Sequence, residues 1–191
     1  MVADVSGKGV PAALYMTLTK GLLASIAAER SDPGDILREV NRHLYEACRK
    51  KVFVTLFLGV LDPLTRRLTY ARAGHNPTVW RSPSQNTTEL LRPSGMGLGL
   101  NQGKIFNATL KVACLQLAPD DALLFYSDGI TEEENSAGED FGTDRLAQIV
   151  AERRTWTVNQ LADYVFGEVS VFSEGKPPTD DRTLVVLRRP A

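Results

Sequence analysis

The chain of 191 residues is long enough for one domain with a substantial hydrophobic core. Its composition, 43% hydrophobic and 24% charged, is that of an ordinary folded protein, and a formal net charge of −1 offers no general attraction for nucleic acid or anionic membranes. Cys48 and Cys114 lack the spacing of a zinc site and the density of a disulfide framework. We therefore expect a cytoplasmic protein with no nucleic-acid partner.

The first candidate functional stretch lies at the N-terminus, where an apolar run ends at Asp4 and a glycine-rich turn follows. Gly7 and Gly9 allow backbone conformations that other residues avoid, and Pro11 suits the first turn of a helix. The stretch predicts a strand, a tight turn and a helix start, with Asp4 at the end of a strand in a sheet.

The first predicted helix spans residues 10–29. Its apolar residues recur at every fourth position and share one face: Leu14, Leu18, Leu22 and Ile26. This pattern predicts a long, largely buried helix. Lys20 and two threonines interrupt the apolar stretch, so we expect no membrane span.

A second amphipathic helix is expected over residues 33–49, with Asp32 as its cap and basic residues at its end. We expect the two helices to pack side by side over one sheet and to carry regulation in the intact protein. Residues 52–61 and 67–73 are rich in β-branched and aromatic residues and are joined by a turn at Asp62, which predicts an antiparallel hairpin.

The rest of the chain continues with strands and ends with helices and one strand. The predicted elements are strands at 78–81, 89–91, 106–117 and 122–127, helices from residue 143 and at 158–172, and a strand at 184–187. Helices at the front, antiparallel strands in the middle and helices near the end predict an α+β domain.

Two further strand ends carry carboxylates. An apolar strand runs directly into Asp128 and Gly129, and Asp180 and Asp181 precede the final strand. Any one of these pairs taken alone favours a simple turn, because Asp and Gly dominate turns. Three acid-bearing strand ends in one small domain instead suggest a site for hard cations such as Mg²⁺ or Mn²⁺.

Other polar residues have simpler interpretations. His75 lies in a turn of Gly, Asn and Pro, where a side chain more often bonds the backbone than acts as a general acid. The acidic run Glu132–Glu134 predicts a solvated loop, with a third cation site as the alternative.

Six segments together resemble the bacterial stage II sporulation protein E (SpoIIE) family, which belongs to the metal-dependent protein phosphatase 2C (PPM) superfamily. In order, they are ADVSGKGVPAAL, FVTLFLGVLD, YARAGHNP, LLFYSDGITE, the pair Phe141-Gly142 and DDRTLVVL. The resemblance covers residues 2–188. It implies a four-layer α-β-β-α sandwich of two mainly antiparallel sheets, with residues 1–191 as one phosphatase domain.

The resemblance implies a protein serine/threonine phosphatase that depends on two Mn²⁺ or Mg²⁺ ions. Asp4 would bridge both ions and the Val5 carbonyl would add a ligand. Asp128 and Asp180 would complete the pair, with Asp181 as the alternative to Asp180. A water activated by the two ions would attack phosphorus without a protein nucleophile. The implied substrate is a phosphoserine on an anti-sigma-factor antagonist, and the intact protein would carry a sensor or receiver domain upstream.

Family members carry an acidic strand pair before the position of Asp4, and nothing in this chain matches it. We therefore expect an N-terminally truncated domain that lacks one metal ligand. The alternative function is a catalytically impaired or non-catalytic regulatory interaction domain, whose open sheet edge would pair with another chain. Assembly with another subunit, as in a homodimer, or a truncated gene model would each explain the missing strands.

Overall fold

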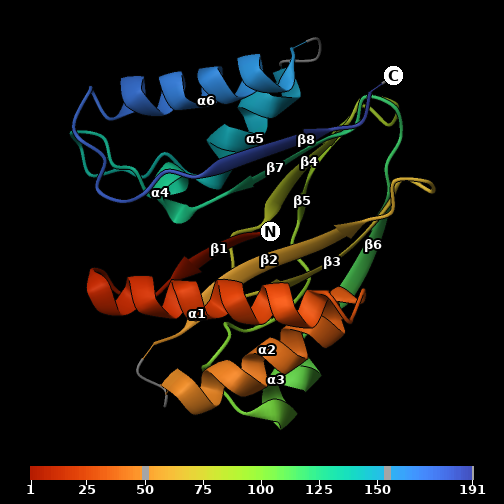
Figure 1. Cartoon of the computed structure of the whole chain (residues 1–191). Helices are drawn as coiled ribbons and strands as arrows, with labels where there is room; N and C mark the ends of the chain where they lie inside the picture. Colours follow the sequence, from red (N-terminus) through yellow and green to blue (C-terminus); the bar gives the residue numbers. More distant parts are fainter. Residues whose placement is uncertain (49–51, 153–155, 191) are drawn as a thin grey trace. The chain divides into compact units, whose positions relative to one another are not determined.

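The computed structural model describes residues 1–48, 52–152 and 156–190 (Figure 1). The chain forms two compact units, and each unit contains one four-stranded antiparallel sheet. The first unit comprises Met1–His75 and Arg92–Gln116, and the second comprises Asn76–Leu91 and Leu117–Ala191. The predicted α+β class with two antiparallel sheets is confirmed.

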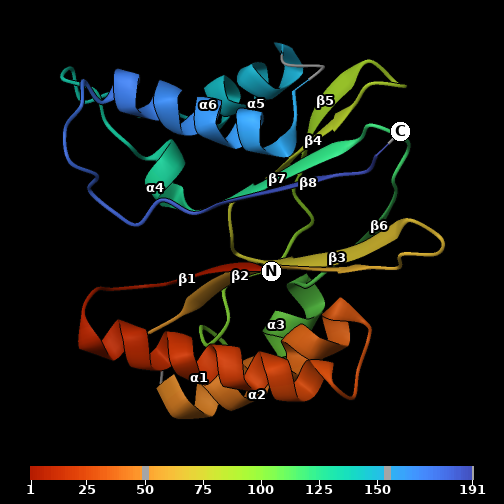
Figure 2. The same ribbon diagram turned by 45° about the horizontal axis from the view of Figure 1, so that its top comes forward.

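The first unit has the strand order β1-β2-β3-β6, with β1 and β6 at its edges. The strands are β1 (Val2–Val5), β2 (Val54–Leu61), β3 (Arg67–Ala73) and β6 (Val112–Gln116). Three helices lie on one face of this sheet in both views (Figures 1 and 2): α1 (Val10–Ala27), α2 (Pro33–Cys48) and α3 (Gly103–Thr109).

Helix α2 supplies much of the first unit's core. Its apolar side chains are fully or almost fully buried: Ile36, Leu37, Val40 and Leu44. The predicted Asp32 cap is confirmed, because its Oδ1 accepts a hydrogen bond from the Asp35 N–H at 2.9 Å. The predicted end of this helix at Arg49, with the basic residues 49–51, lies outside the described residues.

The second unit has the strand order β5-β4-β7-β8. Its strands are β4 (Thr78–Ser82), β5 (Thr87–Leu91), β7 (Ala122–Tyr126) and β8 (Leu184–Arg188). Its helices are α4 (Asp128–Thr131), α5 (Thr143–Glu152) and α6 (Val158–Phe172). Thr157 and Gln160 form a capping box at the start of α6, which explains why this helix begins where the sequence predicts.

The prediction that the first helix is largely buried is wrong. Only Thr19 and Leu23 of α1 are buried, whereas Leu14 is 66% exposed and Leu18 is 38% exposed. Because α1 is apolar on most sides, a spacing of four residues did not identify the face that meets the core. By length and composition alone α1 is apolar enough to cross a membrane, a property that core helices of folded proteins share.

The prediction of one long strand over residues 106–117 is also wrong. Residues Gly103–Thr109 form the short helix α3, and β6 begins only at Val112. Helix α3 places Phe106, which is fully buried, in the core of the first unit. This burial outweighs the weak strand preference of the segment.

Candidate metal centre

Asp4 lies on the edge strand β1, half-buried, at the start of the predicted turn. The Ser6 N–H donates to the Phe53 carbonyl and the Phe53 N–H donates to Ser6 Oγ, each at 2.9 Å. Gly7 and Gly9 have φ values of +93° and +79°, which residues with a Cβ atom rarely adopt. The predicted strand, turn and helix start are therefore confirmed.

Asp128 is the first residue of α4 and is separated from the end of β7 by Ser127 alone. Its neighbour Gly129 packs so closely that an added Cβ would lie 2.5 Å from the Asp181 carbonyl oxygen. Ser127 Oγ donates to the same carbonyl at 2.8 Å and accepts from the Thr183 N–H at 2.9 Å. The segment after β7 therefore lies against the segment before β8.

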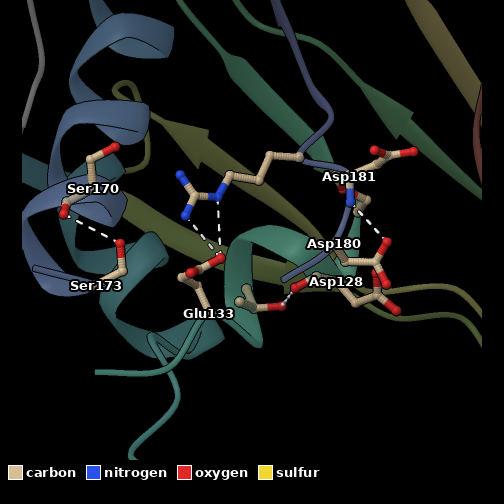
Figure 3. A network of polar contacts seen from close by, with 9 residues as sticks. Asp128, Glu133, Ser170, Ser173, Asp180 and Asp181 are labelled. Carbon is tan, nitrogen blue, oxygen red and sulfur yellow. Dashed lines mark hydrogen bonds and ion pairs between the residues drawn. The ribbon is translucent and has the colours of Figure 1, made fainter. Parts of the chain in front are cut away.

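The side chains of Asp128 and Asp180 lie next to each other in the second unit, whereas the Asp181 side chain points away from them (Figure 3). Asp180 Oδ1 accepts a hydrogen bond from the Asp181 N–H at 2.8 Å, which restrains its carboxylate. Of the two alternatives for the last ligand, Asp180 is thus the better placed to act together with Asp128.

Negative charge is concentrated around these two carboxylates. The pKa of Glu132 is raised from its ordinary value, first because the protein partly shields its carboxylate from water and then because Asp128, Asp140 and Asp180 are close. A divalent cation would relieve the repulsion among such groups.

The chemistry of the donor set fits Mg²⁺ or Mn²⁺. These ions prefer oxygen ligands, and Mg²⁺ is commonly bound by one or two carboxylates while it keeps several waters. Asp128 and Asp180 supply two such carboxylates. Within residues 1–48, 52–152 and 156–190, however, no group of three or more His, Cys, Asp or Glu side chains is arranged to hold an ion.

The remaining predicted ligands belong to the other unit. Asp4 and Val5 lie on β1 in the first unit, and Asp128, Asp180 and Asp181 lie in the second. The convergence of Asp4 with Asp128 and Asp180 on one cleft stays a prediction.

The ring of His75 contacts a threonine side chain, whereas a backbone partner was expected. His75 is 4% exposed, and its Nδ1 lies 2.9 Å from Thr55 Oγ1. Thr55 is the residue paired in register with Asp4 across β1 and β2. Sequence reasoning missed Thr55, because it did not predict that β1 pairs with β2 in this register.

The expectation that the whole run Glu132–Glu134 is solvated is wrong for its middle residue. Glu133 is 1% exposed, and its Oε2 lies 2.9 Å from Arg182 Nη2 and 3.2 Å from Arg182 Nε. Glu134 is bridged to Asp140 across a tight turn.

Comparison with known proteins supports the resemblance inferred from the motifs. The family described as Stage II sporulation protein E (SpoIIE) matches residues 1–190. The phosphoserine phosphatase RsbU of Bacillus subtilis (strain 168) is 29% identical over 188 residues, which are 98% of this chain and 54% of RsbU. Protein IcfG of Synechocystis sp. is 28% identical over 220 residues, covering 99% of this chain and 33% of IcfG. The chain thus spans about half or less of the length of these relatives.

Solved structures share the fold. The SiaA-PP2C domain of Pseudomonas aeruginosa matches with a TM-score of 0.83 at 20% identity, over 97% of this chain and 73% of that one. The PP2C phosphatase domain of SpoIIE from Bacillus subtilis, with a fragment of its regulatory domain, matches with a TM-score of 0.78 at 22% identity, over 97% of this chain and 52% of that one. With the family match extending over nearly all of its residues, the chain belongs to the SpoIIE family and has the fold of PP2C phosphatase domains.

Proposed function

We propose that this chain is a metal-dependent protein serine/threonine phosphatase that hydrolyses a phosphoserine on a regulatory protein. The observation that carries the proposal is the pairing of the Asp128 and Asp180 carboxylates between the ends of β7 and β8, in a chain of the SpoIIE family. Relatives named phosphoserine phosphatases, RsbU and RsbP of Bacillus subtilis, support the same chemistry.

We expect acidic residues of both units to hold the cations. When bound, a pair of Mn²⁺ or Mg²⁺ ions lowers the pKa of a shared water and neutralises the charge of the phosphoryl group. Asp128 and Asp180 would hold an ion from the second unit, and Asp4 with the Val5 carbonyl would contribute from the first. Phosphoryl transfer depends mainly on positioning and charge neutralisation, so no nucleophilic side chain is required.

The finer parts of the proposal concern the substrate and the setting. We take the substrate to be a phosphorylated anti-sigma-factor antagonist or a similar small regulator, with a sensor or receiver domain upstream in the intact protein. A Mycobacterium tuberculosis protein with a similar fold contains an RsbU domain and an RsbW domain, which supports a setting among regulatory proteins. A cytoplasmic location is part of this proposal. Because α1 is apolar enough to associate with a membrane, cell fractionation is the direct test.

The test is a phosphatase assay on a phosphoserine peptide with Mn²⁺, with and without a chelator. We expect activity that requires the metal and that falls at least about 100-fold in Asp128→Asn and Asp180→Asn, more than the 10–100-fold typical of outer partners of a metal. Asp163→Asn on the exposed side of α6 is the matched control and should retain activity. Unchanged activity in both site variants would refute the proposed site. A fully inactive chain with folded structure and bound Mn²⁺ would favour the regulatory interaction domain instead.

A further inference from the structure

A buried ion pair joins the two segments that carry the paired carboxylates. Glu133 follows α4, whose first residue is Asp128, and Arg182 follows Asp180 and Asp181. Figure 3 shows Glu133 with both dashed contacts from the guanidinium of Arg182. The two contacts, 2.9 Å and 3.2 Å long, both reach Glu133 Oε2. The pair therefore ties the Asp128 segment to the Asp180 segment.

Both members of this pair are shielded from water. Glu133 is 1% exposed, and the Arg182 side chain is 12% exposed. The Glu133 carbonyl accepts a hydrogen bond from the Phe141 N–H at 2.9 Å, so its backbone is held as well. If the Glu133 carboxylate moved out to solvent, the largely buried guanidinium of Arg182 would lose its partner. An unpaired buried charge is strongly disfavoured, so the pair stays closed.

A second connection acts on the same segment from the other side of Asp128. Ser127 Oγ bonds both the Asp181 carbonyl and the Thr183 N–H. Asp180 and Asp181 are thus flanked by contacts to residues on either side of Asp128. These contacts require no cation, so they can hold the two carboxylates side by side in the protein alone.

We propose that Glu133 and Arg182 are positioning residues that hold the Asp180 segment beside Asp128 and so set the spacing of the two carboxylates. The inference rests on the proposed function, because that function gives the spacing its purpose. Neither side chain touches the reacting atoms. Their effect passes through the backbone of the Asp180 segment to its carboxylate, in the way that outer partners orient metal ligands.

The test compares Glu133→Gln with Glu134→Gln in the whole chain. Both variants remove one negative charge from the same loop, but Glu134 is exposed and lies outside the pair. Hydrogen exchange at the Asp181 and Thr183 amides, measured without metal, reports whether the segment opens. Titration calorimetry with Mn²⁺ reports the affinity of the site.

In Glu133→Gln we expect exchange at these amides to be about tenfold faster and the Mn²⁺ dissociation constant to rise about tenfold, with neither changed in Glu134→Gln. If the pair only stabilised the fold, Glu133→Gln would lower the unfolding midpoint and leave the exchange rate and the Mn²⁺ dissociation constant unchanged. That result would overturn the inference. Faster exchange with unchanged Mn²⁺ affinity would overturn it too, because the spacing would then not matter to the site.

A second variant covers the case in which Glu133→Gln does not fold. The double variant Glu133→Gln with Arg182→Met removes both charges of the pair, so neither is left buried without its partner. We expect it to fold and to show the same tenfold loss of Mn²⁺ affinity, because the two residues act as one unit. Affinity within twofold of the original chain in this double variant would refute the positioning role.

The two readouts separate this inference from the proposed function. If the unaltered chain bound no Mn²⁺ even at millimolar concentration, the proposed function would fail, and the exchange comparison would still decide whether the pair holds the segment. If the unaltered chain bound Mn²⁺ and Glu133→Gln changed neither exchange nor affinity, the function would stand and the inference would fail.

Discussion

Gly129 lies against the backbone of Asp181 so closely that a methyl group on its α-carbon would sit 2.5 Å from the Asp181 carbonyl oxygen and 3.0 Å from the carbonyl carbon. No side chain can relieve this contact, because the neighbouring atoms belong to backbone. The absence of a Cβ at Gly129 is therefore what allows the segment bearing Asp180 to approach α4.

Gly129→Ala should destabilise the protein and weaken Mn²⁺ binding, because the two segments must separate to admit the methyl group. Ordinarily a helical Gly→Ala change stabilises by about 0.5–1 kcal/mol. Gly167→Ala on α6 is the matched control, since nothing lies within 4 Å of the Cβ that it would add. Urea unfolding of both variants should give free-energy changes of opposite sign. Equal stabilisation by the two changes would contradict the close approach at Gly129.

The exposed face of α1 should tolerate truncation. Leu14→Ala removes a side chain that is 66% exposed, so we expect a change within about 0.5 kcal/mol in the free energy of unfolding. Leu37→Ala on α2 makes the same chemical change at a fully buried position and should cost about 2–5 kcal/mol. Chemical denaturation of both variants gives the comparison. A loss of more than about 2 kcal/mol in Leu14→Ala would mean that this face of α1 is covered in solution.

The two cysteines should differ in reactivity. Hydrogen bonds from Arg67, whose Nη2 lies 3.1 Å from the sulfur, and then from Thr69 lower the pKa of the exposed Cys114 thiol. Burial raises the pKa of Cys48. Because the thiolate is the reactive form, Cys114 should be alkylated first at neutral pH.

Arg67→Met should raise the pKa of Cys114 toward its usual range and so slow its alkylation at neutral pH, while the rate at high pH changes little. The rate against pH, followed by mass spectrometry, measures the shift. Arg66→Met is the control, because the Arg66 guanidinium instead donates to the Pro63 carbonyl. A pH profile that is the same in both variants would show that Arg67 does not control this thiol.

Metal binding tests the predicted convergence of Asp4 with the second unit. We expect at most one tightly bound Mn²⁺ per chain, because Asp128 and Asp180 supply two carboxylates and no third acidic group completes a cluster among the described residues. If Asp4 joins this site, Asp4→Asn should raise the Mn²⁺ dissociation constant by more than about tenfold, about 1.4 kcal/mol. Titration calorimetry measures it, with exposed Asp35→Asn as the control. Asp4→Asn with unchanged affinity would place Asp4 outside the site, and two tight ions would show that our count of ligands is wrong.

Features set by neighbouring residues were predictable from the sequence. The glycines of the first turn, the start of α6 at Val158 and the acids after β7 and before β8 each depend on a few consecutive residues. The local physics of turns and caps decides such features wherever the segment lies in the fold. These local signals place Asp128 and Asp180 beside strands, and the resemblance to the SpoIIE family is what makes them candidate ligands.

Features set by distant packing were not predictable. Glu133 is buried only because Arg182, far along the chain, reaches its carboxylate, and Glu132 and Glu134 look identical to it in the sequence. The face of α1 that meets the core also depends on what the other elements present, since the helix is apolar on most sides. Segment 106–109 became helical because Phe106 had a core to enter.

The order of strands in the first sheet has a consequence for how the chain is made. β3 pairs with β6, from Arg67 opposite Gln116 to Ala71 opposite Val112, yet the β4–β5 hairpin of the second unit lies between them in the chain. During synthesis the second unit's hairpin therefore emerges before the first sheet can be completed. Neither unit corresponds to one continuous stretch of gene, so a single truncation cannot release either of them intact. Pairing across such an insertion also raises the contact order, which predicts slow folding in which the two sheets depend on each other.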